Sequence, residues 1–282
     1  MIGSLGAGVG IACAGQAAGS VKVETVGTIS PKHAAAYVVR NSRNARTTRV
    51  EILLSDSPVD ATAVHAALDP HLSAINLEGL KGRDYVLLWV EANGTVTMNA
   101  TFGQTMTQML NDTNGGLEAE LSANTPSRVE GRVFSPRPVK TLSGTTYSVD
   151  LKFAAAVPAP IAGRALPAGG GDPGKAFTAL LAAVAKKNWP GIRAASSPVA
   201  LKMFEAGYNT PAENAATAAD LLRAWLPAKK LNVAGGQLRG DIALLDVEGE
   251  IFEGQRGLSL VQMVKTGTAW QFERAARAGM LP

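Results

Sequence analysis

The chain has 282 residues, enough for two ordinary domains that each bury a core of their own. Hydrophobic residues make up 46% of it and charged residues 18%, which is typical of a globular protein rather than a disordered one. Its net charge of +4 is too small a surplus to predict a nucleic-acid-binding surface. Its single cysteine, Cys13, excludes an internal disulfide and a metal site built from several thiolates.

Residues 1–18 resemble a leader, because they are small and apolar and no charged side chain occurs before Lys22. The stretch is too short and too rich in glycine for a membrane-spanning helix, and it lacks the basic residues that usually begin a secretory signal. Gly10-Ile11-Ala12-Cys13 approximates a bacterial lipobox, which predicts lipidation of Cys13. Ala12-Cys13-Ala14 is equally acceptable as a small-x-small cleavage site. We therefore expect export to the periplasm or cell envelope, with or without a lipid anchor; the alternative is an ordinary cytoplasmic N-terminus.

Residues 19–156 are expected to form a β-rich domain. Apolar side chains alternate with polar ones in several segments, most clearly over Tyr147–Phe153. Tyr85–Glu91 and Thr95–Ala100 flank Asn93-Gly94, a pair favoured in tight hairpin turns. The pattern predicts an antiparallel sheet or sandwich. Two short helices are expected to interrupt the strands, at Ala61–Leu68 and near Thr105–Leu110.

Residues 157–174 are expected to be a linker, because four prolines and five glycines leave little room for a helix or a central strand. The end of this segment, Gly169–Lys175, matches the first seven places of a phosphate-binding loop. Ala176 stands where that loop needs a hydroxyl for magnesium, so no nucleotide and no other cofactor is expected.

Residues 175–282 begin with helices and continue with strands. An apolar stripe at helical spacing follows Asp172-Pro173, and Thr210-Pro211-Ala212-Glu213 is a capping box that opens a second helix. After Pro227 the period of the apolar residues changes to two. The strands are expected near Lys230–Leu238, Asp241–Ile251, Gly257–Lys265 and Thr268–Arg274. Helices on one face of a curved antiparallel sheet are the natural arrangement.

Two segments of this domain resemble the NTF2-like superfamily, the cystatin-like α+β cones, and especially its small exported bacterial members. They are the opening helix Ala176–Lys187 with Asn188-Trp189-Pro190 after it, and the closing hairpin Val261–Phe272 with Trp270 on its last strand. The resemblance implies an α+β fold class with a pocket between helices and sheet, which binds a ligand or holds acid–base residues. Residues 19–156 resemble no known family.

Three carboxylates are the candidate acid–base groups of such a pocket. Asp246, Glu248 and Glu250 would share one face of a regular strand, and a carboxylate in an apolar cavity has a raised pKa suited to a general base. The alternative is an exposed row paired with basic residues of the same domain. Those basic residues are Lys230, Arg239, Arg256 and Lys265.

Two further clusters lie in the β-rich domain. His65, Asp69 and His71 are suitable zinc ligands, although Pro70 leaves the direction of His71 open and an ordinary polar loop is the alternative. Arginines at every third position alternate between the faces of a strand, unless a turn gathers some of them for an anion. These are Arg40, Arg43, Arg46 and Arg49.

Taken together, the sequence predicts a non-enzymatic exported envelope protein that binds a partner protein or a small apolar ligand, as an accessory subunit of a larger complex. Both faces of the strand at Asp241–Ile251 carry apolar residues, so a partner or a second copy is expected to cover one of them. Nucleic acid is not expected as a partner. The alternative is an isomerase or dehydratase that uses Asp246 or Glu248 as its base.

Overall fold

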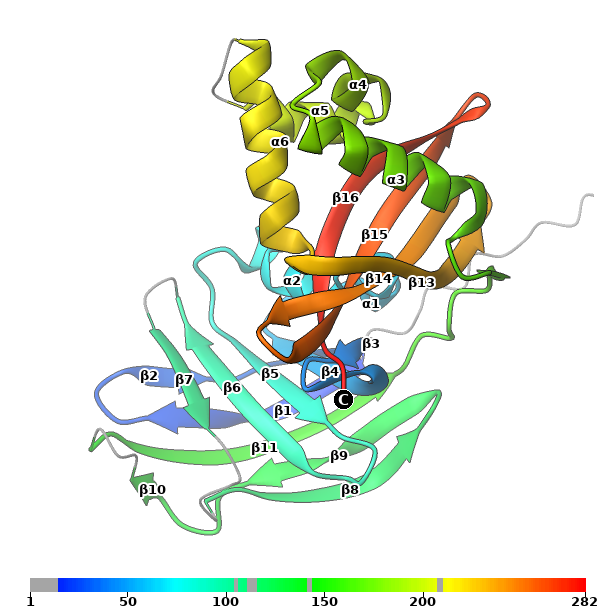
Figure 1. Cartoon of the computed structure of the whole chain (residues 1–282). Helices are drawn as coiled ribbons and strands as arrows, with labels where there is room; N and C mark the ends of the chain where they lie inside the picture. Colours follow the sequence, from blue (N-terminus) through cyan, green and yellow to red (C-terminus); the bar gives the residue numbers. More distant parts are fainter. Residues whose placement is uncertain (1–14, 104–105, 111–115, 141–143, 207–209) are drawn as a thin grey trace, which may run out of the picture. The chain divides into compact units, whose positions relative to one another are not determined.

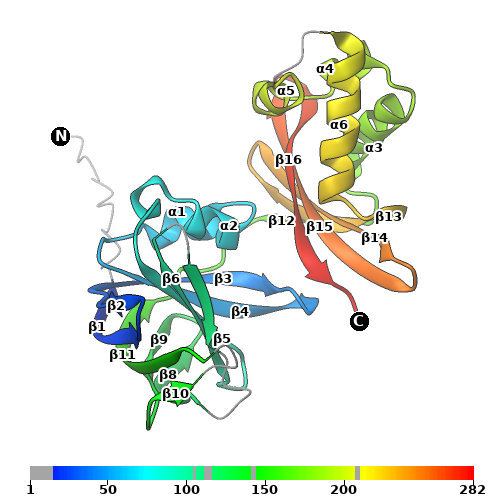
Figure 2. The same cartoon turned by 90° about the vertical axis from the view of Figure 1, so that its left-hand side faces the viewer.

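The computed structural model describes residues 15–103, 106–110, 116–140, 144–206 and 210–282 (Figure 1). Cys13 lies outside these residues. The chain divides into two compact units, one made of residues 1–39 and 49–159 and the other of residues 40–48 and 160–282. Figure 2 turns the same ribbon by 90° and shows the elements of each unit from the side.

The first unit is built on a curled antiparallel sheet of eleven strands. Nine of them follow the order β7-β6-β5-β4-β3-β1-β11-β9-β8, while β2 pairs with β1 and β10 pairs with β11. The strands are β1 (Gly15–Val23), β2 (Gly27–Ile29), β3 (His33–Asn41), β4 (Asn44–Ser55), β5 (Tyr85–Val90), β6 (Val96–Phe102), β7 (Met106–Leu110), β8 (Glu118–Thr125), β9 (Arg128–Phe134), β10 (Val139–Lys140) and β11 (Thr146–Ala156).

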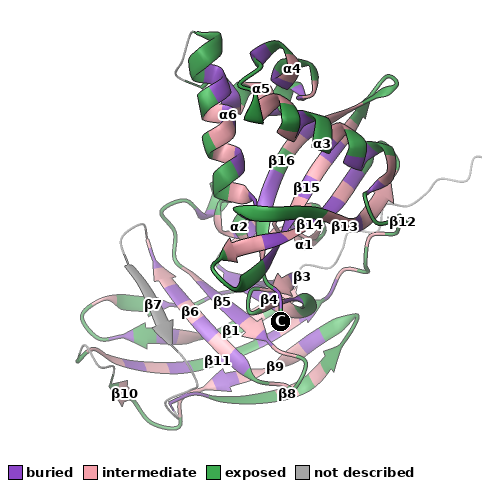
Figure 3. Ribbon diagram, in the orientation of Figure 1, coloured by how far each residue is buried: buried purple, intermediate pink, exposed green. Residues whose placement is uncertain are grey.

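One apolar core fills the inside of this curl. Strand β11 shows the pattern: Val149 and Leu151 are buried, whereas Asp150 and Lys152 between and after them are exposed. Figure 3 shows the same alternation of buried and exposed bands along the strands. Strands from both ends of the sheet contribute to the same cluster, for example Met98 of β6. The sheet therefore closes over its own apolar face, as a half-buried period of two requires.

The opposite face of β3, β4 and β5 is covered as well, by the helices α1 (Ala61–Ala66) and α2 (Pro70–Ile75) and the short 3-10 turn η1 (Glu78–Leu80). Tyr37, Leu53 and Leu87 of the strands pack there against Val64 and Ala74 of the helices. Each helix begins at an aspartate whose carboxylate accepts backbone N–H groups, Asp60 for α1 and Asp69 for α2.

The second unit holds a five-stranded antiparallel sheet in the order β12-β13-β14-β15-β16, with four helices on one face. Its strands are β12 (Arg164–Leu166), β13 (Lys229–Arg239), β14 (Ile242–Phe252), β15 (Gln255–Thr266) and β16 (Ala269–Met280). Its helices are α3 (Gly171–Ala185), α4 (Trp189–Ala194), α5 (Pro198–Phe204) and α6 (Pro211–Trp225). Phe177 and Leu222 of the helices share a core with Leu245, Val261 and Phe272 of the sheet.

Several local predictions are confirmed. The hairpin of β5 and β6 turns at Asn93-Gly94, where Gly94 has a φ of 85° and Thr95 N donates to Asn93 Oδ1 at 3.0 Å. Helix α6 opens with the predicted capping box, since the Thr210 hydroxyl bonds both the backbone N–H and the carboxylate of Glu213.

The predicted fold class, α+β with an NTF2-like α+β cone as its second domain, is wrong. Strands make up 50% of the protein and helices 23%, so it is a β-rich fold rather than a balanced α+β cone. The helix expected near Thr105–Leu110 is wrong too, because Met106–Leu110 pairs with β6 as strand β7. The second sheet also has long strands, of eleven or twelve residues from β13 to β16, whereas α4 and α5 have only six and seven residues.

Residues 157–174 contain regular structure that their proline and glycine content did not predict. Arg164–Leu166 forms the edge strand β12 beside β13, and α3 already begins at Gly171. Gly170, with a φ of 70°, is the N-cap, so the left-handed backbone that only glycine adopts easily lies directly before the helix.

The alternation on β11 predicts that two neighbouring substitutions lower the free energy of unfolding by very different amounts. Leu151→Ala removes a fully buried side chain from the core and should lower the free energy of unfolding by about 2–5 kcal/mol. Lys152→Ala changes an exposed side chain and should cost no more than about 0.5 kcal/mol. Urea unfolding of the intact protein measures both values, and equal losses would show that the two faces of β11 are not assigned correctly.

Candidate functional site

The strongest polar cluster of the first unit is centred on the carboxylate of Glu51 in β4. Ile52 and Leu54 point into the core of the curled sheet, so the alternation turns Glu51 and Leu53 toward the face that α1 and α2 cover. Glu51 is only 1% exposed. A buried carboxylate has to be compensated by hydrogen bonds or opposite charge, since its hydration is lost.

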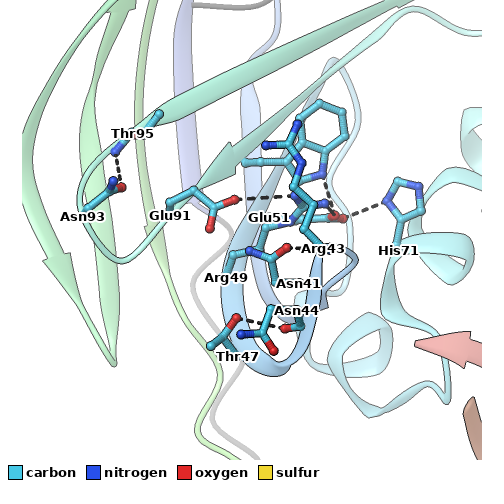
Figure 4. Close-up of polar contacts among 11 residues, drawn as sticks. Asn41, Arg43, Asn44, Thr47, Arg49, Glu51, His71, Glu91, Asn93 and Thr95 are labelled. Carbon is cyan, nitrogen blue, oxygen red and sulfur yellow. Dashed lines mark hydrogen bonds and ion pairs between the residues drawn. The ribbon is translucent and has the colours of Figure 1, made fainter. Parts of the chain in front are cut away.

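Three side chains surround this carboxylate (Figure 4). The indole Nε1–H of Trp89 donates to Oε1 at 2.6 Å, and Arg49 Nη2 lies 3.3 Å from the same oxygen. His71 of α2 places Nδ1 2.9 Å from Oε2. Both carboxylate oxygens of Glu51 are therefore engaged: Oε1 by side chains of β4 and β5, and Oε2 by the histidine of α2.

Arg49 links this carboxylate to a second one. Its guanidinium lies 5.3 Å from the centroid of the Trp89 ring, in cation–π geometry, and Nη1 lies 3.6 Å from Glu91 Oε1. Arg49 thus lies between two carboxylates while its side chain is 18% exposed. The cluster carries its charges in compensating pairs rather than as one unpaired charge.

The cluster shifts two pKa values. The hydrogen bond to Glu51 raises the pKa of His71 above its ordinary value of 6.5, against the opposing effect of burial. Burial, and after it the charge of Glu51, raises the pKa of Tyr37 far above its usual range. Tyr37 is fully buried, so it stays a neutral phenol, and the positive form of His71 is the one that the site stabilises.

The arrangement of Glu51 and His71 resembles the pair that orients a general base, but a reaction needs more. Among the described residues, no serine, threonine or cysteine side chain is hydrogen-bonded to His71. The cavity of about 690 Å³ lies elsewhere, between β1, β11, β9 and β8, and a smaller one of about 400 Å³ lies among loops near Asp56. Through His71, the Glu51 cluster links α2 to the sheet.

The zinc candidates are not gathered into one site. His65 Nδ1 accepts the backbone N–H of Val38 at 3.4 Å, Asp69 caps α2 through Leu72 N, and His71 bonds Glu51. No group of three or more histidine, cysteine, aspartate or glutamate residues in the described part of the chain could hold a metal ion.

The acid–base candidates of the second unit lie on the face of β14 opposite to its helix-covered core. Arg40, one of the residues 40–48 that belong to this unit, places Nη2 2.9 Å from Asp246 Oδ1. Glu248 lies 2.6 Å from Arg256 and 3.6 Å from Arg46. Glu250 lies 3.3 Å from Lys230, whose hydrogen bond and charge lower the pKa of the carboxyl group.

The four arginines at every third position accordingly serve different partners. Arg40 and Arg46 pair with the carboxylates of β14, and Arg49 pairs with Glu51 and Glu91. Among the described contacts, Arg43 is engaged through its backbone N–H, which donates to Asn41 Oδ1 at 3.0 Å.

A different feature of the second sheet was predicted only in part. On the face away from the helices, β14 and β15 present four apolar side chains, which we call the apolar sheet patch: Ile242, Leu244, Leu260 and Val264. Ile242 is 40% exposed and the other three are half-buried. The register pairs Ile242 with Val264 and brings the four together across neighbouring strands.

Polar side chains lie beside and within the apolar sheet patch. On β13, Arg239 Nε donates to Gln237 Oε1 at 2.7 Å, and burial lowers the pKa of Arg239. On β15, Gln262 lies opposite Leu244, between Leu260 and Val264, and donates to Glu273 of β16. The patch therefore has polar side chains both at its edge and between its apolar ones.

No family model, curated protein or solved structure matches this chain. The resemblance of residues 175–282 to the NTF2-like superfamily accordingly stays a prediction. In the described part of the chain, no helix has the length and apolar character needed to cross a membrane.

The Glu51 cluster predicts that the indole N–H of Trp89 stabilises the fold beyond its packing. Trp89→Phe keeps an aromatic ring but leaves Glu51 Oε1 with Arg49 alone, so it should lower the free energy of unfolding by about 1–3 kcal/mol. Trp270→Phe is the matched control, since Trp270 packs against the second core and no hydrogen bond of its indole is described. Chemical denaturation measures both, and a Trp270→Phe loss as large as that of Trp89→Phe would contradict the role of the N–H.

Proposed function

We propose that this protein is a non-enzymatic, exported binding protein of the cell envelope that docks a partner protein on the apolar sheet patch of its second unit. The observation that carries the proposal is the exposure of Ile242, at 40%, at the start of β14, where it pairs with Val264 of β15 on the face away from the helices. A sheet face in contact with water is expected to be polar, and contiguous apolar side chains on it usually mark an interface.

The edge of the patch indicates the chemistry of the partner. Arg239 is half-buried, and its one described side-chain partner is the neutral amide of Gln237. A guanidinium whose burial already disfavours its charge gains most from a carboxylate supplied by the partner. We therefore expect a protein surface with an apolar centre and an aspartate or glutamate at its edge.

The pairing of the candidate bases supports binding over catalysis. Asp246 and Glu248 both have arginine partners and lie outside the helix-covered core, so neither lies in the closed apolar pocket expected of a general base. Both carboxylate oxygens of Glu51 likewise have partners among their own neighbours. An isomerase or dehydratase would need a polar group free to meet the substrate.

The patch is tested by a charge at its most exposed position. Ile242→Asp should abolish a complex that the wild-type protein forms in detergent extracts of its native envelope, because a carboxylate would be buried without a partner on docking. Val199→Asp is the matched control, since Val199 is also 40% exposed but lies on α5, in the first turn, where an acidic residue is tolerated. Size exclusion of the tagged full-length proteins measures the complex.

Arg239→Ala adds the second half of this test: it should weaken the same complex and reduce its sensitivity to salt. Sedimentation of the purified wild-type protein distinguishes a second copy, which would appear as a dimer, from a different partner. A wild-type protein that migrates as a monomer in the native extract, or an Ile242→Asp protein that keeps its complex, would contradict the proposal.

Export is tested at Cys13, which follows the lipobox-like Gly10-Ile11-Ala12. Mass spectrometry of protein from the native source should show either a diacylated Cys13 or a chain that begins shortly after Ala14. Cys13→Ser should remove the acyl mass in the first case and change nothing in the second. A chain that still begins at Met1 in a cytosolic fraction would contradict export.

A further inference from the structure

The two short helices over the first sheet are held by histidines. The chain has three histidines, and two of them, His65 of α1 and His71 of α2, reach down to neighbouring strands. His65 Nδ1 accepts the backbone N–H of Val38 on β3 at 3.4 Å. His71 Nδ1 lies 2.9 Å from Glu51 on β4.

The two bonds differ in whether the ring nitrogen carries a proton: Nδ1 of His71 has to be protonated, and Nδ1 of His65 has to be unprotonated. A nitrogen that accepts a backbone N–H carries no proton, so protonation at Nδ1 removes the bond of His65. The nitrogen that faces the carboxylate of Glu51 has to carry a proton, and the positive imidazolium binds it more strongly than the neutral ring does.

We propose that residues 61–75 form a pH-responsive cover of the first sheet, fastened by His71 in its charged form. The cover is held most firmly where His71 is charged, and it loosens as the pH rises and His71 loses its charge. Its release uncovers the apolar side chains of Tyr37, Leu53 and Leu87, which the helices otherwise bury.

The charged groups around His71 come from every element near it. Strand β4 supplies Arg49 and Glu51, α2 supplies Asp69, and β3 supplies the neutral phenol of Tyr37. The bond to Glu51 is the largest influence and, with Asp69, favours the charged ring, whereas burial and Arg49 oppose it. The geometry and the balance of charge therefore both favour imidazolium.

The direction of the pH effect follows from this balance. Because the pKa of His71 is raised in the folded protein, the stabilisation from its charge is fully present below the ordinary histidine pKa of 6.5. It is lost as the pH rises through the raised value. Glu91 accompanies Arg49 on the far side of Glu51 and keeps the network close to neutral when His71 is charged.

The cover is small enough to open without global unfolding. Helices α1 and α2 have six residues each, and only Val64 and Ala74 of their residues are buried. Helices of this length are unstable by themselves and depend on their contacts to the sheet. Loss of one hydrogen bond therefore changes the opening equilibrium of this segment before that of the sheet.

Hydrogen exchange of the full-length protein tests the proposal. After correction for intrinsic rates, the protection of amides in residues 61–75 should fall severalfold as the pH rises above the histidine range, relative to α6 amides. His71→Gln should flatten this dependence on pH. His33→Gln, which changes the histidine outside the cover, should keep it.

Two outcomes would overturn the proposal. One is a protection of residues 61–75 that is independent of pH in the wild type, or that changes only in parallel with α6. The other is an unchanged dependence on pH in His71→Gln. If that variant fails to fold, an NMR titration of the wild-type His71 imidazole decides instead: a pKa at or below 6.5 would refute its role.

Discussion

Strand β4 has to bury both of its faces, and much of the first unit depends on that constraint. Ile52 and Leu54 belong to the core inside the curl, and Leu53 belongs to the core beneath α1 and α2. Glu51, at the same face as Leu53, is therefore buried as well, although an isolated buried carboxylate would be very costly. The indole of Trp89, the guanidinium of Arg49 and the imidazole of His71 make the burial tolerable.

This compensation also limits what the cluster can do. Each oxygen of this carboxylate already has a partner, and removing any one donor leaves part of its charge unpaired in a dry environment. Such networks specify one arrangement of the elements around them, in this case the position of α2 on β4 and β5. The cost of the buried charge is offset only while α2 is in place, which is why the helix and the carboxylate depend on each other.

The sequence predicted the first sheet well, because an antiparallel strand with one buried face has a clear period. It predicted the hairpin at Asn93-Gly94 from turn chemistry and the opening of α6 from Thr210 and Glu213. It did not predict the Glu51 cluster, since Arg49 and Glu51 look like the exposed side of a strand. One sequence signal pointed to it: Leu53 is apolar although it alternates with the core residues of β4, which indicates that this second face of the strand is covered as well. Strand β7 was missed for a related reason, because a short edge segment has too few residues to distinguish a helix from a strand.

The two sheets differ in what covers their second apolar face. In the first unit, the second apolar face of β3–β5 is covered by α1 and α2 from the same segment of chain. In the second unit, the four helices all lie on one face, and the other face of β14 combines carboxylates held by arginines with Ile242 and Leu244. The ion pairs account for the polar half of that face, but they do not bury the apolar half. Ile242 and Leu244 therefore stay partly in contact with water on this face, and it is this exposure that the proposed docking surface would remove.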